Sequence, residues 1–245
     1  MSTNSKLIIL GCGHSESEVN LNNNAAVLTN EKLLLIDCGY TIKSALKNQG
    51  FKISDIDSIY ISHVHGDHVF GLERVGYECL FKYKFRPTLF IKKELYKELW
   101  DNTLKGSMSK IGEGEASLET FFKVVFIEND SFYFHDIKIE TLKVKHTPNK
   151  PSFGICIQNK YLYTTDTIAI PETLSKYKFD YCFHDVTLSD YNPVHATLNS
   201  LLNSYTKTTR KKMYLMSYED NWNDYESSVN LNFKGFIKEG DTFDI

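Results

Sequence analysis

The feature that most constrains the fold is an apolar strand that runs directly into a cluster of histidines. The stretch DSIYIS (57–62) predicts a buried strand, and the hexapeptide HVHGDH (63–68) follows it without a break. His63 and His65 are two residues apart, so in extended backbone their imidazoles point to the same side. The chain is therefore expected to bring these two rings together at one edge of a sheet.

The second half of the hexapeptide predicts a turn that brings further ligands to the same point. Gly66 permits a sharp change of direction, and Asp67 and His68 then face back from the start of the next helix. Neutral imidazoles and a carboxylate suit zinc or a similar divalent ion. One ion cannot easily use four ligands from so short a loop, whereas two neighbouring ions can share them. The sequence predicts a site for one or two ions, Zn²⁺ first, with Mn²⁺ or Fe²⁺ as alternatives.

Two residues elsewhere are suited to complete this site. His146 ends a strand in KVKHTP, and Asp166 ends a strand in YLYTTD. Each is weak evidence alone, because single His and Asp residues are common at strand ends. Both nevertheless directly follow strands, as the histidines of the hexapeptide do. Ligands of one site at the edge of the sheets would need that placement.

The apolar runs predict two meanders of strands, each followed by helices, in a single domain (1–245). Hairpin-like pairs such as NAAVLT and KLLLID, joined at Asn30-Glu31, argue against a doubly wound parallel sheet. Helical spacing recurs in YTIKSALKNQGF, KELYKELWDNTL and HATLNSLLNSY. The fold class is expected to be α+β, a four-layer αββα sandwich of two mixed β-sheets packed face to face, with helices on both outer sides.

Composition narrows the class of protein. Hydrophobic residues make up 42% of the chain, enough for a large core, and the net charge of −3 excludes the positive field of a dedicated nucleic-acid binder. The five cysteines are scattered, odd in number and without a C-x-x-C pair, which argues against a disulfide scaffold. The N-terminal segment lacks the apolar run of a signal peptide or anchor. A cytoplasmic protein with no membrane contact is expected.

Taken together, these motifs resemble the metallo-β-lactamase superfamily. The resemblance runs from ILGCGHSESEVNLNNNAAVL and LLLIDCG, through ISHVHGDHVFGL, to HTP, YTTD and YLMSY, and covers most of the chain. It implies a hydroxide between two metal ions as the nucleophile, since metal binding lowers the pKa of water toward neutrality. The first ion would be held by three histidines, His63, His65 and His146. The second would be held by Asp67 and His68, with Asp166 as the bridge, and Asp67 is expected to take part in catalysis.

Within the superfamily, the C-terminal half looks most like ribonuclease Z and related phosphodiesterases. FHDVT (183–187) resembles the His-Glu-Ala-Thr element of that group, with Asp185 in place of the glutamate. HATLNSL (195–201) resembles its His-Ser-Thr element. The resemblance implies that His195 is a general acid or phosphate ligand and that Asp185 orients it. A histidine at a helix start with no catalytic duty is the alternative for His195.

The chain departs from the family pattern in two places. The last metal ligand of the family is a histidine after a strand, and Ser217 stands there. Glu219 and Asp220 are the nearest carboxylates able to substitute, although acids near a helix start usually act as caps. Ribonuclease Z also carries a long basic arm, whereas the comparable stretch here is the short segment 105–117, either a lid or an ordinary loop. Processing of tRNA 3′ ends is therefore not expected.

Three functions remain open. The first is a phosphodiesterase acting on a nucleotide, a cyclic nucleotide or single-stranded nucleic acid, and the low net charge favours a small substrate. The second is hydrolysis of a thioester, lactone or lactam, which would not need His195 and Asp185. The third is a degenerate member that binds a ligand without turnover, supported only by Ser217. His14 lies on a loop that the family places at the metal mouth, as a candidate substrate contact, and a homodimer is expected by analogy.

Overall fold

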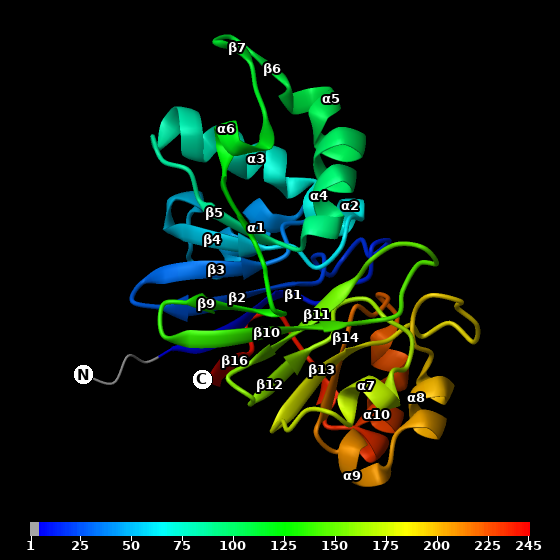
Figure 1. Cartoon of the computed structure of the whole chain (residues 1–245). Coiled ribbons are helices and arrows are strands. Elements are labelled where there is room, and N and C mark those ends of the chain that lie inside the picture. Colours follow the sequence, from blue (N-terminus) through cyan, green and yellow to red (C-terminus); the bar gives the residue numbers. More distant parts are fainter. Residues whose placement is uncertain (1–4) are drawn as a thin grey trace.

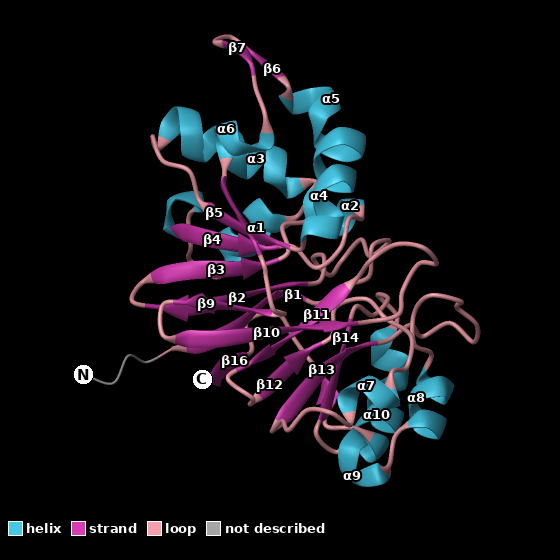
Figure 2. Cartoon of the chain, in the orientation of Figure 1, coloured by secondary structure: helices cyan, strands magenta, loops and turns pink. Residues whose placement is uncertain are grey.

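The computed structural model describes residues 5–245 and contains two large mixed sheets packed face to face, with helices on their outer sides (Figures 1 and 2). The expected four-layer αββα sandwich is thereby confirmed. No helix within residues 5–245 is both long enough and apolar enough to cross a membrane.

The first sheet is built mainly from the N-terminal half of the chain. The spatial order of its strands is β16 (Thr242–Asp244), β1 (Lys6–Gly11), β2 (Asn24–Thr29), β3 (Lys32–Ile36), β4 (Ile56–Tyr60), β5 (Thr88–Ile91) and β8 (Lys123–Phe126). Neighbouring strands are antiparallel from β16 to β3 and parallel from β3 to β8. The turn predicted at Asn30-Glu31 joins β2 to β3, with both residues at positive φ.

The second sheet is built from the C-terminal half. The spatial order of its strands is β15 (Gly235–Phe236), β14 (Met213–Met216), β13 (Tyr181–Asp185), β12 (Tyr161–Tyr163), β11 (Phe153–Ile157), β10 (Ile137–Lys143) and β9 (Ser131–Phe134). Neighbouring strands are parallel from β15 to β12 and antiparallel from β12 to β9. Both sheets are therefore mixed.

The helices form the two outer layers (Figure 1). Those beside the first sheet are α1 (Ile42–Asn48), α2 (Gly66–Val69), α3 (Gly71–Tyr77), α4 (Lys93–Leu99), α5 (Lys105–Met108) and α6 (Leu118–Phe121). Those beside the second sheet are α7 (Pro171–Leu174), α8 (Leu198–Ser204), α9 (Lys207–Arg210) and α10 (Glu226–Asn232). Short 3₁₀ or π turns extend the helices at η2 (Glu78–Lys82), η3 (Trp100–Leu104) and η4 (Trp222–Tyr225), and the 3₁₀ turn η1 (Ile53–Asp55) leads into β4.

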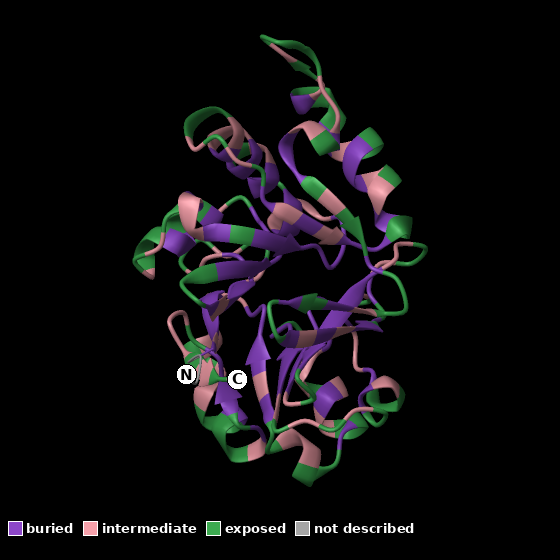
Figure 3. Ribbon diagram, turned by 60° about the vertical axis from the view of Figure 1, so that its left-hand side comes forward, coloured by how far each residue is buried: buried purple, intermediate pink, exposed green. Residues whose placement is uncertain are grey.

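Strand β3 shows why the layers hold together. Leu34 and Ile36 belong to the core between the two sheets, whereas Leu33 and Leu35 belong to the core between the first sheet and its helices. Alternate side chains of a strand point to opposite faces, so an unbroken apolar run is suited to a strand covered on both sides. Burial of each leucine stabilises the fold by roughly 2 kcal/mol. Figure 3 shows the resulting buried strands in the middle of the molecule.

The segment 105–117, described above as a lid or an ordinary loop, has regular structure. It begins with α5, which continues the helix from α4 through η3, and then forms a hairpin of β6 (Lys110–Ile111) and β7 (Gly114–Glu115). Figure 1 shows this hairpin projecting beyond the helices of the first sheet.

Candidate metal centre

The sequence-predicted site residues meet at one edge shared by both sheets. His63 follows β4, His146 follows β10, Asp166 follows β12, Asp185 ends β13 and Ser217 follows β14. The strand pairing makes β10, β12, β13 and β14 run in the same direction, so their carboxyl ends lie at one edge. Loops at the carboxyl ends of parallel strands are a common place for sites.

Three imidazoles form the first cluster. Nδ1 of His65 lies 3.1 Å from Nε2 of His63 and 3.1 Å from Nε2 of His146. Nδ1 of His146 faces the carbonyl oxygen of Val194 at 3.0 Å and therefore donates its proton there, which leaves the lone pair on Nε2. Nδ1 of His63 is similarly paired with Ser62 Oγ at 2.9 Å. Each ring therefore turns one nitrogen toward a common point.

Burial keeps these rings in the form that binds metal. It lowers the pKa of His63 well below its ordinary value, with the neighbouring His68 acting in the same direction. Burial and then the nearby His146 lower the pKa of His65 to about 4. Both imidazoles are consequently neutral at physiological pH, as ligands must be.

The second cluster joins one imidazole to two carboxylates. Nε2 of His68 lies 3.3 Å from Oδ2 of Asp67 and 3.3 Å from Oδ2 of Asp166. The same oxygen of Asp166 lies 3.9 Å from Nε2 of both His63 and His146, so it stands between the clusters. This is the place expected for a bridging ligand.

The electrostatics of the second cluster call for positive charge. Burial alone would lower the pKa of His68, but the surrounding carboxylates raise it well above its ordinary value. Nε2 of His68 is buried and has no hydrogen-bond partner of acceptable geometry among residues 5–245. A divalent cation would satisfy this nitrogen and the carboxylates together, so the donor set fits a metal ion.

Asp37 is a buried residue of the candidate site that the motifs did not single out. Its Oδ2 accepts hydrogen bonds from Nδ1 of His68 at 2.8 Å and from Oγ of Ser62 at 2.7 Å. Its Oδ1 accepts from the backbone N–H of Ser62 at 2.8 Å. It thus fixes the orientation of His68. The sequence feature that could have identified Asp37 is its place directly after a buried strand, in LLLID.

His195 and Asp185 form a buried pair beside the clusters. Nδ1 of His195 lies 2.8 Å from Oδ2 of Asp185, which also accepts the backbone N–H of Thr167 at 2.8 Å. Burial alone would lower the pKa of His195, but the charge and hydrogen bond of Asp185 raise it to about 9. Ligand atoms of His195, His146 and Asp166 all lie within 4.8 Å of one another. The pair therefore places a protonated imidazole next to the expected ligands.

Ser217 lies where the last family ligand was expected. Its side chain is buried, and its Oγ is 3.5 Å from Oδ1 of Asp166. The acids proposed as substitutes are engaged elsewhere. Glu219 accepts hydrogen bonds from the hydroxyl of Thr187 and the backbone of Leu188, and Asp220 accepts the backbone N–H groups of residues 18–20. Neither acid, left open above as a substitute ligand or a helix cap, belongs to a cluster of potential ligands within residues 5–245.

The remaining histidines have separate environments. His184 is buried, with Nδ1 2.7 Å from the Asp185 carbonyl oxygen and Nε2 2.9 Å from the hydroxyl of Tyr205. Both of its ring nitrogens therefore have partners in the protein, as in a residue that stabilises the fold. His135 is exposed in the turn between β9 and β10. His14 lies against His195, with ring centroids 5.1 Å apart.

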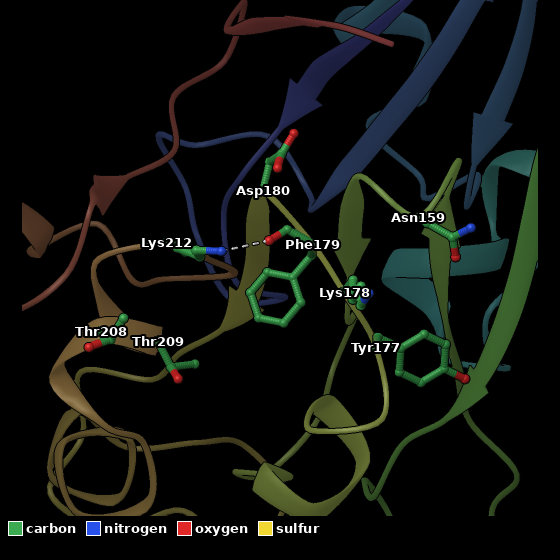
Figure 4. A pocket seen from close by; sticks show the side chains of 8 residues that line it. All are labelled: Asn159, Tyr177, Lys178, Phe179, Asp180, Thr208, Thr209 and Lys212. Carbon is green, nitrogen blue, oxygen red and sulfur yellow. Dashed lines mark hydrogen bonds between the residues drawn. The ribbon is translucent and has the colours of Figure 1, made fainter.

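Two hollows differ in their relation to this centre. One of about 280 Å³ has His195 in its wall, together with residues of the 190–192 loop and the start of α8. A larger one of about 480 Å³, shown in Figure 4, is lined by Phe179, Lys212 and neighbours at the opposite, amino-terminal end of β13. Lys212 Nζ there donates to the Phe179 carbonyl at 3.0 Å. Of the two, only the smaller hollow is lined by a residue of the expected site, His195, and neither is lined by an expected metal ligand.

Known structures share this fold. A diphosphatase of the PhnP family matches with a TM-score of 0.80 at 18% identity, covering 98% of both chains. The metallo-beta-lactamase fold protein YhfI from Bacillus subtilis gives 0.78 at 15% identity, covering 99% of this chain and 100% of its own. Human tRNase Z, short form, gives 0.68 at 17% identity, covering 98% and 99%. These matches confirm the metallo-β-lactamase fold that the sequence motifs resemble.

Curated relatives are closer in sequence. The Anti-Pycsar protein Apyc1 of Paenibacillus harenae is 34% identical over 223 residues, which are 89% of this chain and 91% of its own. The protein of the same name from Bacillus phage 010DV004 is 30% identical and covers 97% of both chains. Fold, donor set and relatives agree on a metal-dependent hydrolase of the phosphodiesterase type. Since the family model described as Anti-Pycsar protein Apyc1 also matches residues 5–243, the chain belongs to that family.

Proposed function

We propose that this chain is a cyclic nucleotide phosphodiesterase that uses two divalent ions. The observation that carries the proposal is the His195–Asp185 pair beside the metal ligands. Hydrolysis of a phosphodiester needs a proton for the leaving oxygen, and an imidazole with a pKa of about 9 is protonated at neutral pH. Opening of a thioester or lactam on this scaffold would not require the pair.

The ligands divide as the two clusters indicate. The first ion would be held by His63, His65 and His146, and a set of three imidazole nitrogens favours zinc. The second would be held by Asp67 and His68, with Asp166 shared between both. When bound, such ions supply Lewis acidity and a water of lowered pKa.

The residues of the chain would supply the other half of the chemistry. One P–O ester bond breaks and the oxygen of water joins phosphorus. Nε2 of His195 gives its proton to the departing ribose oxygen, so the product is a nucleoside monophosphate. Asp185 keeps the imidazole charged and oriented, through Nδ1, during this transfer.

A small substrate fits the surroundings better than a polymer. The hollow beside His195 measures about 280 Å³, and the chain carries a net charge of −3. A long polyanion would need a basic track, because phosphate contacts dominate nucleic-acid affinity. Membership of the Apyc1 family supports a nucleotide-type substrate. A cyclic nucleotide is a compact phosphodiester with a single negative charge, and it meets these requirements.

The test compares substrate classes on protein of known metal content. The zinc-loaded chain is assayed with cyclic nucleotides, an activated aryl phosphodiester, a thioester and a β-lactam. We expect turnover of the phosphodiesters alone, and a loss of at least about 100-fold in kcat for His195→Ala. Turnover of the thioester or lactam that is unaffected by His195→Ala would contradict the proposal. No turnover of any ester with Zn²⁺, Mn²⁺ or Fe²⁺ would show a binding protein instead.

A further inference from the structure

His14 lies in a loop that the fold holds firmly against the metal centre. The loop follows the carboxyl end of β1, and the backbone N–H of His14 donates to the carbonyl of Tyr218 at 2.9 Å. The next turn is fixed by Asp220, which accepts N–H groups of residues 18–20, and by the Tyr40 hydroxyl, which donates to the Ser15 carbonyl at 2.7 Å. His14 is thus placed beside the strand exit that carries Ser217.

The contacts of the ring define which nitrogen carries the proton. Nδ1 of His14 lies 3.4 Å from the backbone nitrogen of Glu16, which donates to it. In the neutral ring the proton is therefore on Nε2. That Nε2 is buried and has no hydrogen-bond partner among residues 5–245. Buried donors are nearly always satisfied, so this N–H calls for an acceptor from a ligand.

The position of the ring indicates what that ligand is. His14 packs edge-on against His195, with centroids 5.1 Å apart and planes at 63°. Its atoms belong to none of the clusters of potential metal ligands found in residues 5–245. Because the lone pair is on Nδ1 and engaged by the backbone, Nε2 is a donor to an anion rather than a ligand to a cation.

We propose that His14 is a substrate-binding residue that donates Nε2–H to a phosphoryl oxygen next to His195. This proposal rests on the phosphodiesterase function proposed above and adds a contact to it. His195 faces the leaving oxygen as a charged donor, and His14 holds another oxygen of the same group from the β1–β2 loop. Two imidazoles then hold the phosphoryl group beside His146, whose ring centroid lies 4.9 Å from that of His195.

The experiment measures phosphate binding apart from turnover. Inorganic phosphate is titrated calorimetrically into zinc-loaded wild type, His14→Phe and His14→Gln, and KM and kcat are measured with a cyclic nucleotide. Phenylalanine keeps the edge contact with His195 but has no donor, whereas glutamine restores one. His135→Asn, in an exposed turn where asparagine tolerates the positive φ, is the matched control.

We expect His14→Phe to weaken phosphate binding and raise KM by roughly tenfold, the usual effect of one hydrogen bond to a charged group, with a smaller change in kcat. His14→Gln should recover part of the loss, and metal content should not change. Unaltered phosphate affinity in His14→Phe would overturn the proposal, and loss of zinc from that variant would make His14 a ligand instead. If wild type binds phosphate but cleaves no cyclic nucleotide, the proposed function fails while the assignment of His14 is still decided by the titration. Wild type that binds no phosphate overturns the assignment.

Discussion

Oδ2 of Asp185 lies 2.8 Å from Nδ1 of His195, and the carboxylate is completely buried. A carboxylate taken out of water beside an imidazole stabilises the protonated ring, which explains why the pKa of His195 is raised although burial opposes it. The protonation state of His195 therefore affects the free energy of unfolding as well as the charge of the site.

The first prediction concerns metal-free protein. Because the folded pKa of His195 is about 9, above its ordinary value of 6.5, its contribution is complete below pH 6.5 and is lost as pH rises through 9. The free energy of unfolding of wild type relative to His195→Gln should therefore fall by on the order of 3 kcal/mol between pH 6 and pH 10. Urea titrations of the chelator-treated proteins measure it. A difference independent of pH would show that the pair is not charged.

Asp37 should matter for metal without touching it. We predict that Asp37→Asn weakens the second ion by roughly 10- to 100-fold, because His68 loses the partner that orients it. Competition with a chelator of known affinity gives the measurement. Asp57→Asn, an exposed acid on β4, is the control and should leave affinity unchanged. Equal loss in both variants would point to a general charge effect.

The ligand clusters predict distinct metal contents. His146→Ala should release the first ion, since it leaves two imidazoles there, whereas Asp67→Ala should retain it and lose the second. Elemental analysis after gel filtration reports ions per chain. A single ion lost identically in both variants would indicate one shared site.

Ser217 offers a gain-of-function test. Ser217→His should raise the affinity of the protein for the second ion by at least about tenfold. Even a residue that only orients a metal ligand changes metal affinity by about that factor, and a direct ligand should do at least as much. The residue has φ +63, a region that histidine occupies more readily than branched residues. Isothermal titration of zinc into wild type and variant compares the weaker site. No change in affinity or stoichiometry would show that residue 217 does not face the ion.

Much of the candidate centre was accessible from sequence because most of its candidate ligands lie just after strands. The spacing of His63 and His65 fixes their common side, and the strand exits at His146 and Asp166 indicate a shared edge. Asp37 escaped notice because its role depends on which strands are neighbours, β3 beside β4, and not on local spacing. The same holds for Glu219, which the sequence left open as a substitute ligand or a cap; it accepts a hydrogen bond from the hydroxyl of Thr187, which is distant in the sequence.

The sandwich was predicted from hairpins and apolar runs, but some details depend on tertiary contacts. The π turns at η2 and η3 leave no mark in the hydrophobic pattern, since they add one residue to a helical turn. The hairpin of β6 and β7 is too short and polar to be recognised as strands.

The first cluster takes His63 and His65 from the first sheet and His146 from the second. An ion bound there cross-links the two halves of the chain, in addition to the core that already joins them. Ligand binding that requires the folded state adds to its stability by mass action. The melting temperature of this chain should accordingly climb with free zinc concentration, so that a shortage of metal would shorten the lifetime of the protein as well as stop its chemistry.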